Sequence, residues 1–185
     1  MRHLTREELE AGLDAIRQAP ANDGVLELIV RRPAIGQREL LDVGELDLAQ
    51  GLVGDTWRVR GSSRTVDGTP HPDMQVNIMS TRAVALVAQD RERWALAGDQ
   101  LFIDLDLSDR NLPAGSRLAL GSAVVEITAQ PHTGCGKFVA RYGLAAMKFV
   151  NSPLGRALRL RGLNARVLRP GTIRVGDVAR KVASA

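Results

Sequence analysis

Cysteine is almost absent from this sequence of 185 residues, since Cys135 is the only one. An intramolecular disulfide is therefore excluded, and the three histidines (His3, His71 and His132) are too few to complete a usual structural zinc site with it. Long apolar runs are also missing: no segment approaches the roughly 18 residues of a membrane span, and the first residues hold no apolar core of a signal peptide. We therefore expect a cytoplasmic protein that does not engage a membrane and whose thiol stays reduced and able to react.

Aromatic residues are scarce too, at 3% of the chain, whereas hydrophobic residues make up 44% and charged residues 25%. Leu, Val, Ala and Ile must therefore fill the core, and the composition is that of a globular protein rather than a disordered or fibrous one. Few aromatic rings leave few platforms on which bases could stack, and no nucleic-acid-binding motif is present. We expect no nucleic acid among the partners.

Acidic residues are absent from one long segment, although the whole chain has a net charge of only +4. Between Ile127 and Gly176 there is no Asp or Glu, and the segment holds nine cationic residues: Lys137, Arg141, Lys148, Arg156, Arg159, Arg161, Arg166, Arg169 and Arg174. The rest of the chain holds the other 16 of the 25 cationic residues and all 21 acidic ones, so its net charge is −5. We expect the positive segment to attract a small anion, the alternative being a solvated basic face.

Apolar periodicity and turn residues predict many short strands with a few helices. The expected strands are residues 25–30, 38–43, 75–79, 100–105, 117–120 and 123–128, followed by a hairpin of 164–168 and 172–178. The expected helices are residues 5–19, 80–96, a segment after Cys135 that bends at Gly143, and a short one from Pro153 through Leu160. Residues 54–73 are rich in Gly, Ser, Thr, Pro and Asp, which favours a long functional loop. The pattern predicts a mainly β protein of the α+β class, a β-barrel with peripheral helices rather than a doubly wound sheet.

The segment Gln130-Pro131-His132-Thr133-Gly134-Cys135-Gly136-Lys137 joins a predicted strand to a predicted helix. A thiol just before a helix meets the positive end of the helix dipole, and Lys137 and His132 can add positive charge. Each effect favours the thiolate, which attacks electrophiles and binds soft metals. Two alternatives stay open: a small buried hydrophobe, and a hydrolytic dyad with His132 or His71 as base.

The order of several short motifs resembles a MOSC domain, the C-terminal module of molybdenum cofactor sulfurases, which also occurs as a stand-alone bacterial protein. The motifs are Arg32-Pro33 with Arg38-Glu39, Gly51-Leu52-Val53-Gly54-Asp55, Gly61-Ser62-Ser63-Arg64, Gly98-Asp99-Gln100-Leu101, Leu120-Gly121-Ser122-Ala123 with Glu126-Ile127, Gln130 to Cys135, Arg166-Val167-Leu168 and Gly176-Asp177. The only cysteine falls on the family's cysteine. Trp57, His132 and Gly134 depart from the family pattern, which would have His, Arg and Pro at these places.

The resemblance implies a distorted mixed β-barrel over residues 23–185, preceded by an N-terminal helical extension over residues 1–22. It also implies molybdenum cofactor as the ligand, an anionic pterin, with Cys135 as molybdenum ligand or persulfide carrier and a sulfur donor or a molybdoenzyme as protein partner. The candidate cofactor-binding residues are Lys137, His132, Arg64, Asn77, Arg82, Asn111, Arg156, Arg166 and Asp55.

Whether the chain is an enzyme stays open, with sulfur transfer or a part in a molybdenum-dependent oxidoreductase as the two activities to consider. No pyridoxal phosphate is expected, because no module for it fits in 185 residues. The alternative function is a non-catalytic module that binds a small anion through arginines such as Arg156 or Arg166, with Cys135 incidental.

Overall fold

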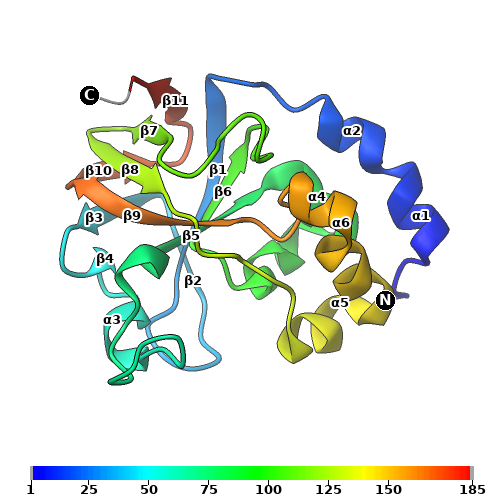
Figure 1. Cartoon of the computed structure of the whole chain (residues 1–185), viewed down its shortest axis with the longest axis horizontal. Coiled ribbons are helices and arrows are strands. Elements are labelled where there is room, and N and C mark those ends of the chain that lie inside the picture. Colours follow the sequence, from blue (N-terminus) through cyan, green and yellow to red (C-terminus); the bar gives the residue numbers. More distant parts are fainter. Residues whose placement is uncertain (1, 184–185) are drawn as a thin grey trace.

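A computed structural model describes residues 2–183, and a closed β-barrel forms its centre (Figure 1). Seven strands follow one another around the barrel: β11 (Val178–Val182), β7 (Arg117–Leu120), β8 (Ala123–Ile127), β9 (Leu163–Arg169), β5 (Val76–Ser80), β6 (Leu101–Asp104) and β1 (Gly24–Arg31). Pairing of Gly24 with Ala179 and of Val25 with Val178 closes the ring between β1 and β11. The sheet is mixed because β5 and β6 run parallel, while the other neighbouring pairs are antiparallel. The expected barrel is confirmed.

A smaller sheet of three strands lies beside the barrel, in the order β10 (Gly171–Arg174), β3 (Val43–Asp47) and β4 (Gly51–Leu52), and β2 (Glu39–Leu41) extends the main sheet along β1. The predicted hairpin of residues 164–168 and 172–178 is wrong. Its first strand, β9, pairs with β8 over residues 165–169 and with β5 over residues 163–165. The chain turns at Pro170, and β10 pairs with β3 instead.

The alternation of side chains along the strands builds two separate cores. On β6, Leu101 and Ile103 point into the barrel, whereas Phe102 between them points out into a second core under the helices. On β5, Ile78 likewise points into the barrel and Met79 points into the second core. Because helices cover the outer face of these strands, every residue of β5 is buried.

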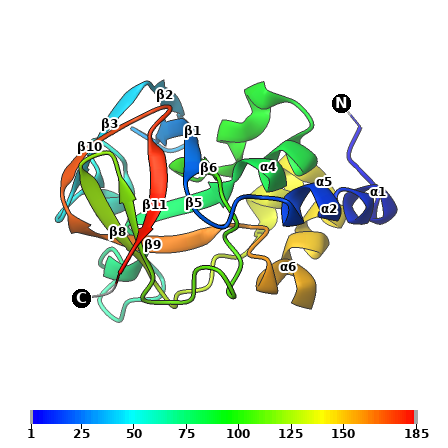
Figure 2. The same cartoon turned by 90° about the horizontal axis from the view of Figure 1, so that it is seen from above.

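The second core lies between the barrel and a layer of helices gathered on one side of it (Figures 1 and 2). The layer contains α1 (Arg6–Ala11), α2 (Leu13–Arg17), α4 (Thr81–Ala88), α5 (Gly136–Asn151) and α6 (Pro153–Ala157), whereas α3 (Trp57–Arg60) lies near the small sheet. The loop expected over residues 54–73 holds α3 and the start of the 3-10 helix η1 (Pro72–Met74). None of the helices in residues 2–183 has the length and apolar character needed to cross a bilayer.

Two predicted helices are interrupted. The helix expected over residues 5–19 begins with the predicted capping box of Thr5 and Glu8, but it is divided at Gly12 into α1 and α2. A Cβ at Gly12 would lie 2.5 Å from Leu86 Cδ1, so the glycine permits the close approach of α4. The helix expected over residues 80–96 ends at Ala88, because Gln89 adopts a left-handed conformation and Asp90 caps a new 3-10 helix, η2 (Arg91–Ala97).

The helix after the cysteine is confirmed, including its bend. Gly143 has φ 90° and ψ 163°, which interrupts α5 in its middle. The Ser152 side chain then accepts a hydrogen bond from the Gly155 N–H, and Pro153 takes the first position of α6, where its missing N–H costs nothing. The short helix ends at Ala157, earlier than the predicted Leu160.

Candidate functional site

Cys135 lies at the N-cap of α5, with its side chain exposed. Its carbonyl accepts hydrogen bonds from the N–H groups of Phe138 (2.9 Å) and Val139 (3.1 Å). Partial burial raises the pKa of the thiol, but the backbone N–H groups of Phe138 and Lys137 and the charges of Arg161 and Lys137 together outweigh it, so the pKa is lowered from its ordinary value. The alternative of a small buried hydrophobe is therefore wrong, and the site presents an accessible thiol with enhanced thiolate character.

His132 comes before the cysteine in the same loop but does not add the positive charge expected of it. Burial lowers the pKa of His132 well below its ordinary value, and the surrounding arginines, led by Arg161 and Arg32, lower it further. Its Nδ1 lies 3.4 Å from Asp99 Oδ1, and within the described residues the ring makes no hydrogen bond to the thiol. His71 caps η1 through its Nδ1. Neither histidine is placed here as the base of a Cys–His dyad.

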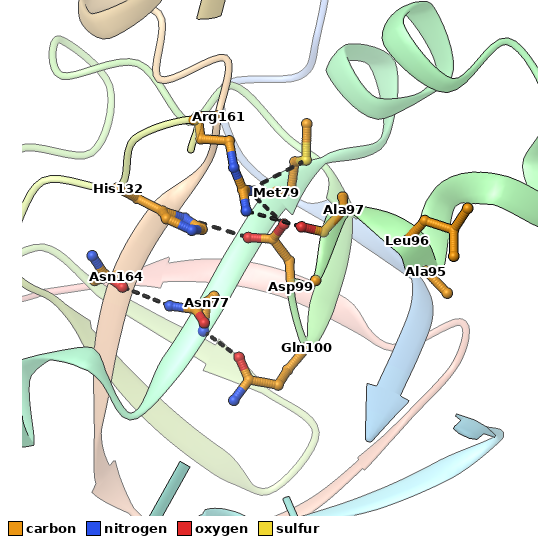
Figure 3. A network of polar contacts seen from close by, with 12 residues as sticks. Asn77, Met79, Ala95, Leu96, Ala97, Asp99, Gln100, His132, Arg161 and Asn164 are labelled. Carbon is orange, nitrogen blue, oxygen red and sulfur yellow. Dashed lines mark hydrogen bonds and ion pairs between the residues drawn. The ribbon is translucent and has the colours of Figure 1, made fainter. Parts of the chain in front are cut away.

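A buried ion pair of Arg161 and Asp99 lies next to His132 of the cysteine loop (Figure 3). Arg161 Nη1 donates to Asp99 Oδ2 at 2.6 Å and its Nη2 donates to the Ala97 carbonyl at 2.9 Å. Its guanidinium also lies over the Phe138 ring, 5.2 Å from the centroid, in the first turn of α5. Burial raises the pKa of Asp99, and Arg161 acts in the opposite direction. Arg161 thus ties the start of β9, the end of η2 and the helix that carries the thiol to one another.

A second buried network extends across the same end of the barrel. Arg32 binds both carboxylate oxygens of Asp55, at 2.8 Å and 2.7 Å, and its Nη1 donates to Asn77 Oδ1 at 3.2 Å. The side-chain amide of Asn77 in turn donates to Asn164 Oδ1 at 2.6 Å, and the backbone N–H of Asn77 donates to the side-chain oxygen of Gln100. The Asp55 carboxylate also accepts hydrogen bonds from the backbone N–H groups of Arg32 and Trp57. It therefore fixes the start of the loop of residues 54–73 to the end of β1.

Arginines from distant parts of the chain surround His132. Those whose charge acts on its ring are Arg161, Arg32, Arg64 and Arg60, in that order. Arg64 reaches the cysteine loop directly, since its Nη1 lies 3.3 Å from both Gln130 Oε1 and the Pro131 carbonyl. Burial, followed by the charge of Arg32, lowers the pKa of Arg60. This cationic region favours an anionic ligand.

A pocket of ≈ 300 Å³ adjoins the cationic region on the side of α6. His132 and Arg161 belong to its wall, as does Arg156, which is exposed and makes no ion pair or side-chain hydrogen bond within residues 2–183. Arg159, also in the wall, is paired with Asp109 at 2.6 Å. Of the cations around this pocket, Arg156 is therefore available to a ligand.

Three of the expected ligand residues are not brought to this site. Arg82 on α4 binds Asp104 and the Ala15 carbonyl, and Asn111 holds a turn through the carbonyls of Ala21 and Asp106. Arg166 on β9 binds Glu126 at 2.6 Å and Asp73 at 3.3 Å. By contrast, Lys137, His132, Arg64 and Asn77 lie in the cysteine loop, in contact with it, or in the network beside it.

The positive charge of the segment between Ile127 and Gly176 is partly neutralised by acidic residues outside it. Three of its nine cations, Arg159, Arg161 and Arg166, pair with acids from other parts of the chain. The residues that sequence reasoning did not select are Arg32, Arg60, Asp99 and Arg161. Arg32 belongs to the motif Arg32-Pro33, Asp99 belongs to Gly98-Asp99-Gln100-Leu101, and Arg161 lies in the acid-free segment. The sequence therefore contained a pattern that pointed to each of these three residues.

No cluster of three or more His, Cys, Asp or Glu side chains within residues 2–183 is placed to hold a metal ion. Cys135 is the soft, accessible donor that the site offers to a metal.

Comparison with known proteins gives one family and several solved structures. A family model described as "MOSC domain" matches residues 66–180. The YUAD protein from Bacillus subtilis has a TM-score of 0.64 at 16% identity, covering 87% of this chain and 97% of that one. YiiM from Escherichia coli has a TM-score of 0.56 at 19% identity, with 87% and 71% covered. YiiM from Geobacillus stearothermophilus has a TM-score of 0.54 at 14% identity, with 88% and 74% covered. No curated protein gives a significant sequence match. At these identities the structures show a shared fold.

Proposed function

The chain belongs to the MOSC domain family, and from this premise we propose that it binds a molybdenum-cofactor-type ligand at the site around Cys135 and His132. The observation that carries the proposal is the position of the only thiol: it is exposed, at the N-cap of α5, beside a region of arginines. The thiol offers a soft ligand, and the arginines offer partners for the anionic part of a pterin.

The residues present fit such a group. Within residues 2–183, one polar atom of the site, Arg161 Nε, is buried without a hydrogen-bond partner. The carboxylates within reach, Asp55 and Asp99, are paired with Arg32 and Arg161, so neither presents a free negative charge to an anion. When bound, the cofactor would supply a redox-active molybdenum centre.

In this proposal Cys135 is the residue that binds molybdenum, and its lowered pKa increases the fraction of the thiolate, which is the form that binds metals. Arg64, Arg60 and the free Arg156 hold the anionic part of the ligand. Arg32 and Arg161 are positioning residues, because their guanidinium groups are occupied by Asp55 and Asp99.

The exposure of the thiol also supports the role of persulfide carrier. A thiolate there would attack the terminal sulfur of a donor's persulfide, forming a new S–S bond while the donor's sulfur leaves as thiolate. A donor protein needs direct access for this exchange, and an exposed N-cap position provides it.

The test is the molybdenum content of protein produced in cells that make the cofactor. We expect the wild-type protein to carry molybdenum, and Cys135→Ser to lose most of it because an alcohol is a far weaker ligand than a thiolate. Lys148→Ala serves as the matched control, since Lys148 is another cation of α5 and lies in its second half, beyond the bend at Gly143. Equal molybdenum in wild type and Cys135→Ser, or none in either, would contradict the ligand role.

The same preparation separates the non-catalytic alternative, in which arginines hold a small anion and the cysteine is incidental. Of the two arginines considered for that role, Arg156 is the better candidate, because it lies in the pocket wall and makes no ion pair within residues 2–183, whereas Arg166 is paired with Glu126. The alternative predicts binding that survives Cys135→Ser and is lost in Arg156→Ala, with thermal unfolding of both variants used to confirm that they are folded.

A further inference from the structure

His132 and Asp99 face each other through two buried atoms (Figure 3). His132 Nδ1 lies 3.4 Å from Asp99 Oδ1, and within residues 2–183 neither of these atoms makes a hydrogen bond. The other carboxylate oxygen, Oδ2, accepts a hydrogen bond from Arg161 at 2.6 Å. Since an unpaired buried polar atom is costly, a shared proton between Nδ1 and Oδ1 is the arrangement that satisfies both atoms.

The ion pair decides which of the two atoms carries that proton. A protonated Asp99 would leave the buried guanidinium of Arg161 without a counter-charge, which is strongly unfavourable. The carboxylate therefore stays ionised and accepts, and the proton lies on His132 Nδ1. In a neutral imidazole this leaves a bare lone pair on Nε2.

Nε2 is the open nitrogen of the ring. It has no partner in the described part of the chain and is not among the buried unpaired atoms, and the side chain keeps 13% of its surface exposed in the pocket wall. The charged and titratable groups that act on the ring are Asp99, Arg161, Arg32, Arg64 and Arg60. Four cations against one paired carboxylate disfavour an imidazolium, so the lone pair persists at neutral pH.

We infer that His132 is the hydrogen-bond acceptor of this site, with Asp99 holding the proton on Nδ1 and Nε2 receiving an N–H or O–H donor of the bound ligand. The inference rests on the proposed function and narrows it. Arginines can only donate hydrogen bonds, so they recognise any oxyanion. The lone pair of His132 adds a second requirement, because a fully deprotonated oxyanion has no hydrogen to place there. The ligand must combine an anionic group with a ring N–H or an O–H, as a pterin does.

The proton position can be measured directly with ¹⁵N-labelled histidine by NMR. We expect His132 to be neutral with Nδ1 protonated from pH 6 to pH 8. His71 is an internal reference of the opposite kind, because its Nδ1 accepts the Asp73 N–H at 3.2 Å and its neutral form must carry the proton on Nε2. An imidazolium or an Nε2–H form of His132 at pH 7 would overturn the inference.

Contact with the ligand is tested with two probes, 6-carboxypterin and molybdate, at pH 8. His132→Phe should weaken 6-carboxypterin binding by about three- to tenfold, the effect of one lost hydrogen bond, and should leave molybdate binding unchanged. His132→Gln, which restores an acceptor oxygen, should recover part of the loss. Unchanged pterin binding in a folded His132→Phe protein, or an equal loss for both probes, would overturn the inference. If the wild-type protein bound no 6-carboxypterin, the proposed function would fail, whereas the NMR result decides the state of His132 in either case.

Discussion

Two opposing influences set the state of the single thiol. Burial disfavours the thiolate of Cys135, whereas the N–H groups of Phe138 and Lys137 and the cations Arg161 and Lys137 favour it, and the balance lowers the pKa. A group at the N-terminus of α5 therefore gains reactivity from its backbone surroundings as well as from charged side chains.

The lowered pKa predicts the pH profile of alkylation. Below its ordinary pKa of about 8.5 a thiol is mostly protonated and unreactive, so lowering the pKa moves the midpoint of the rate profile to lower pH. We expect iodoacetamide to alkylate Cys135 with a midpoint below that value, and Lys137→Ala to move the midpoint upward. The chain has no other cysteine, so Cys135→Ser gives the blank. A midpoint at or above about 8.5 would contradict the expectation.

Single residues also show how far the site could be predicted from the sequence. Cys135, His132 and Lys137 lie in one loop, so local reasoning found them. Arg32 and Asp99 were part of recognisable motifs, but their partners Asp55 and Arg161 are 23 and 62 residues away in the sequence. Only the folded barrel brings these charges together, and burial then changes the role of His132 from a cation to an acceptor.

At the scale of elements, glycines with positive φ set where strands and helices begin. Gly162, between Arg161 and β9, has φ +100°, and a Cβ there would lie 2.3 Å from the Ile78 carbonyl oxygen. Gly115, before β7, has φ +89° and open space around its Cβ position. An alanine would have a strained backbone at either position, but only at Gly162 would its Cβ also be crowded.

This difference predicts two stability changes. Gly115→Ala should lower the free energy of unfolding by about 1–2 kcal/mol through backbone strain alone. Gly162→Ala should cost more, because the backbone of β5 must also shift, and it should disturb the neighbouring Arg161–Asp99 pair. Urea unfolding of both variants measures the two values. Equal losses would show that β5 yields to the extra methyl group without cost.

Elements specified by local signals were predicted well, and those decided by tertiary packing were not. The bend at Gly143 and the start of a helix at Pro153 were predicted from the sequence, because each depends on residues close by. The partner of β10 was not visible, because β10 pairs with β3, which lies more than a hundred residues earlier in the sequence. The division of the first helix at Gly12 likewise depends on Leu86 of α4.

At the scale of the whole molecule, the two cores share the strands β1, β5 and β6 as a common wall. The N-terminal helices contribute Leu9, Leu13 and Ile16 to the outer core, where they are 0%, 7% and 8% exposed. The boundary between an extension of residues 1–22 and a domain of residues 23–185 stays a prediction. Because the helices fill part of the outer core, the stability of residues 23–185 depends on them.

Removal of residues 1–22 tests that boundary. Burial of three aliphatic side chains contributes about 5–9 kcal/mol, against a total stability of about 5–15 kcal/mol for a typical protein. We therefore expect residues 23–185 alone to lose cooperative thermal unfolding, and Leu9→Ala in the full chain to cost about 2–5 kcal/mol. A truncated protein that melts like the full chain would show that the helices are a separable addition.

The closure of the barrel between β1 and β11 has a consequence for biosynthesis. β11 is made last among the strands, so a nascent chain on the ribosome can assemble the pairs from β1 to β9 but cannot form the seam of Gly24 with Ala179 and Val25 with Val178. Until β11 has left the exit tunnel, the edges of β1 and β7 that it will cover remain open to strands of other chains. Pairing of β11 with β1 and β7 thus converts an open sheet with two exposed edges into a closed ring.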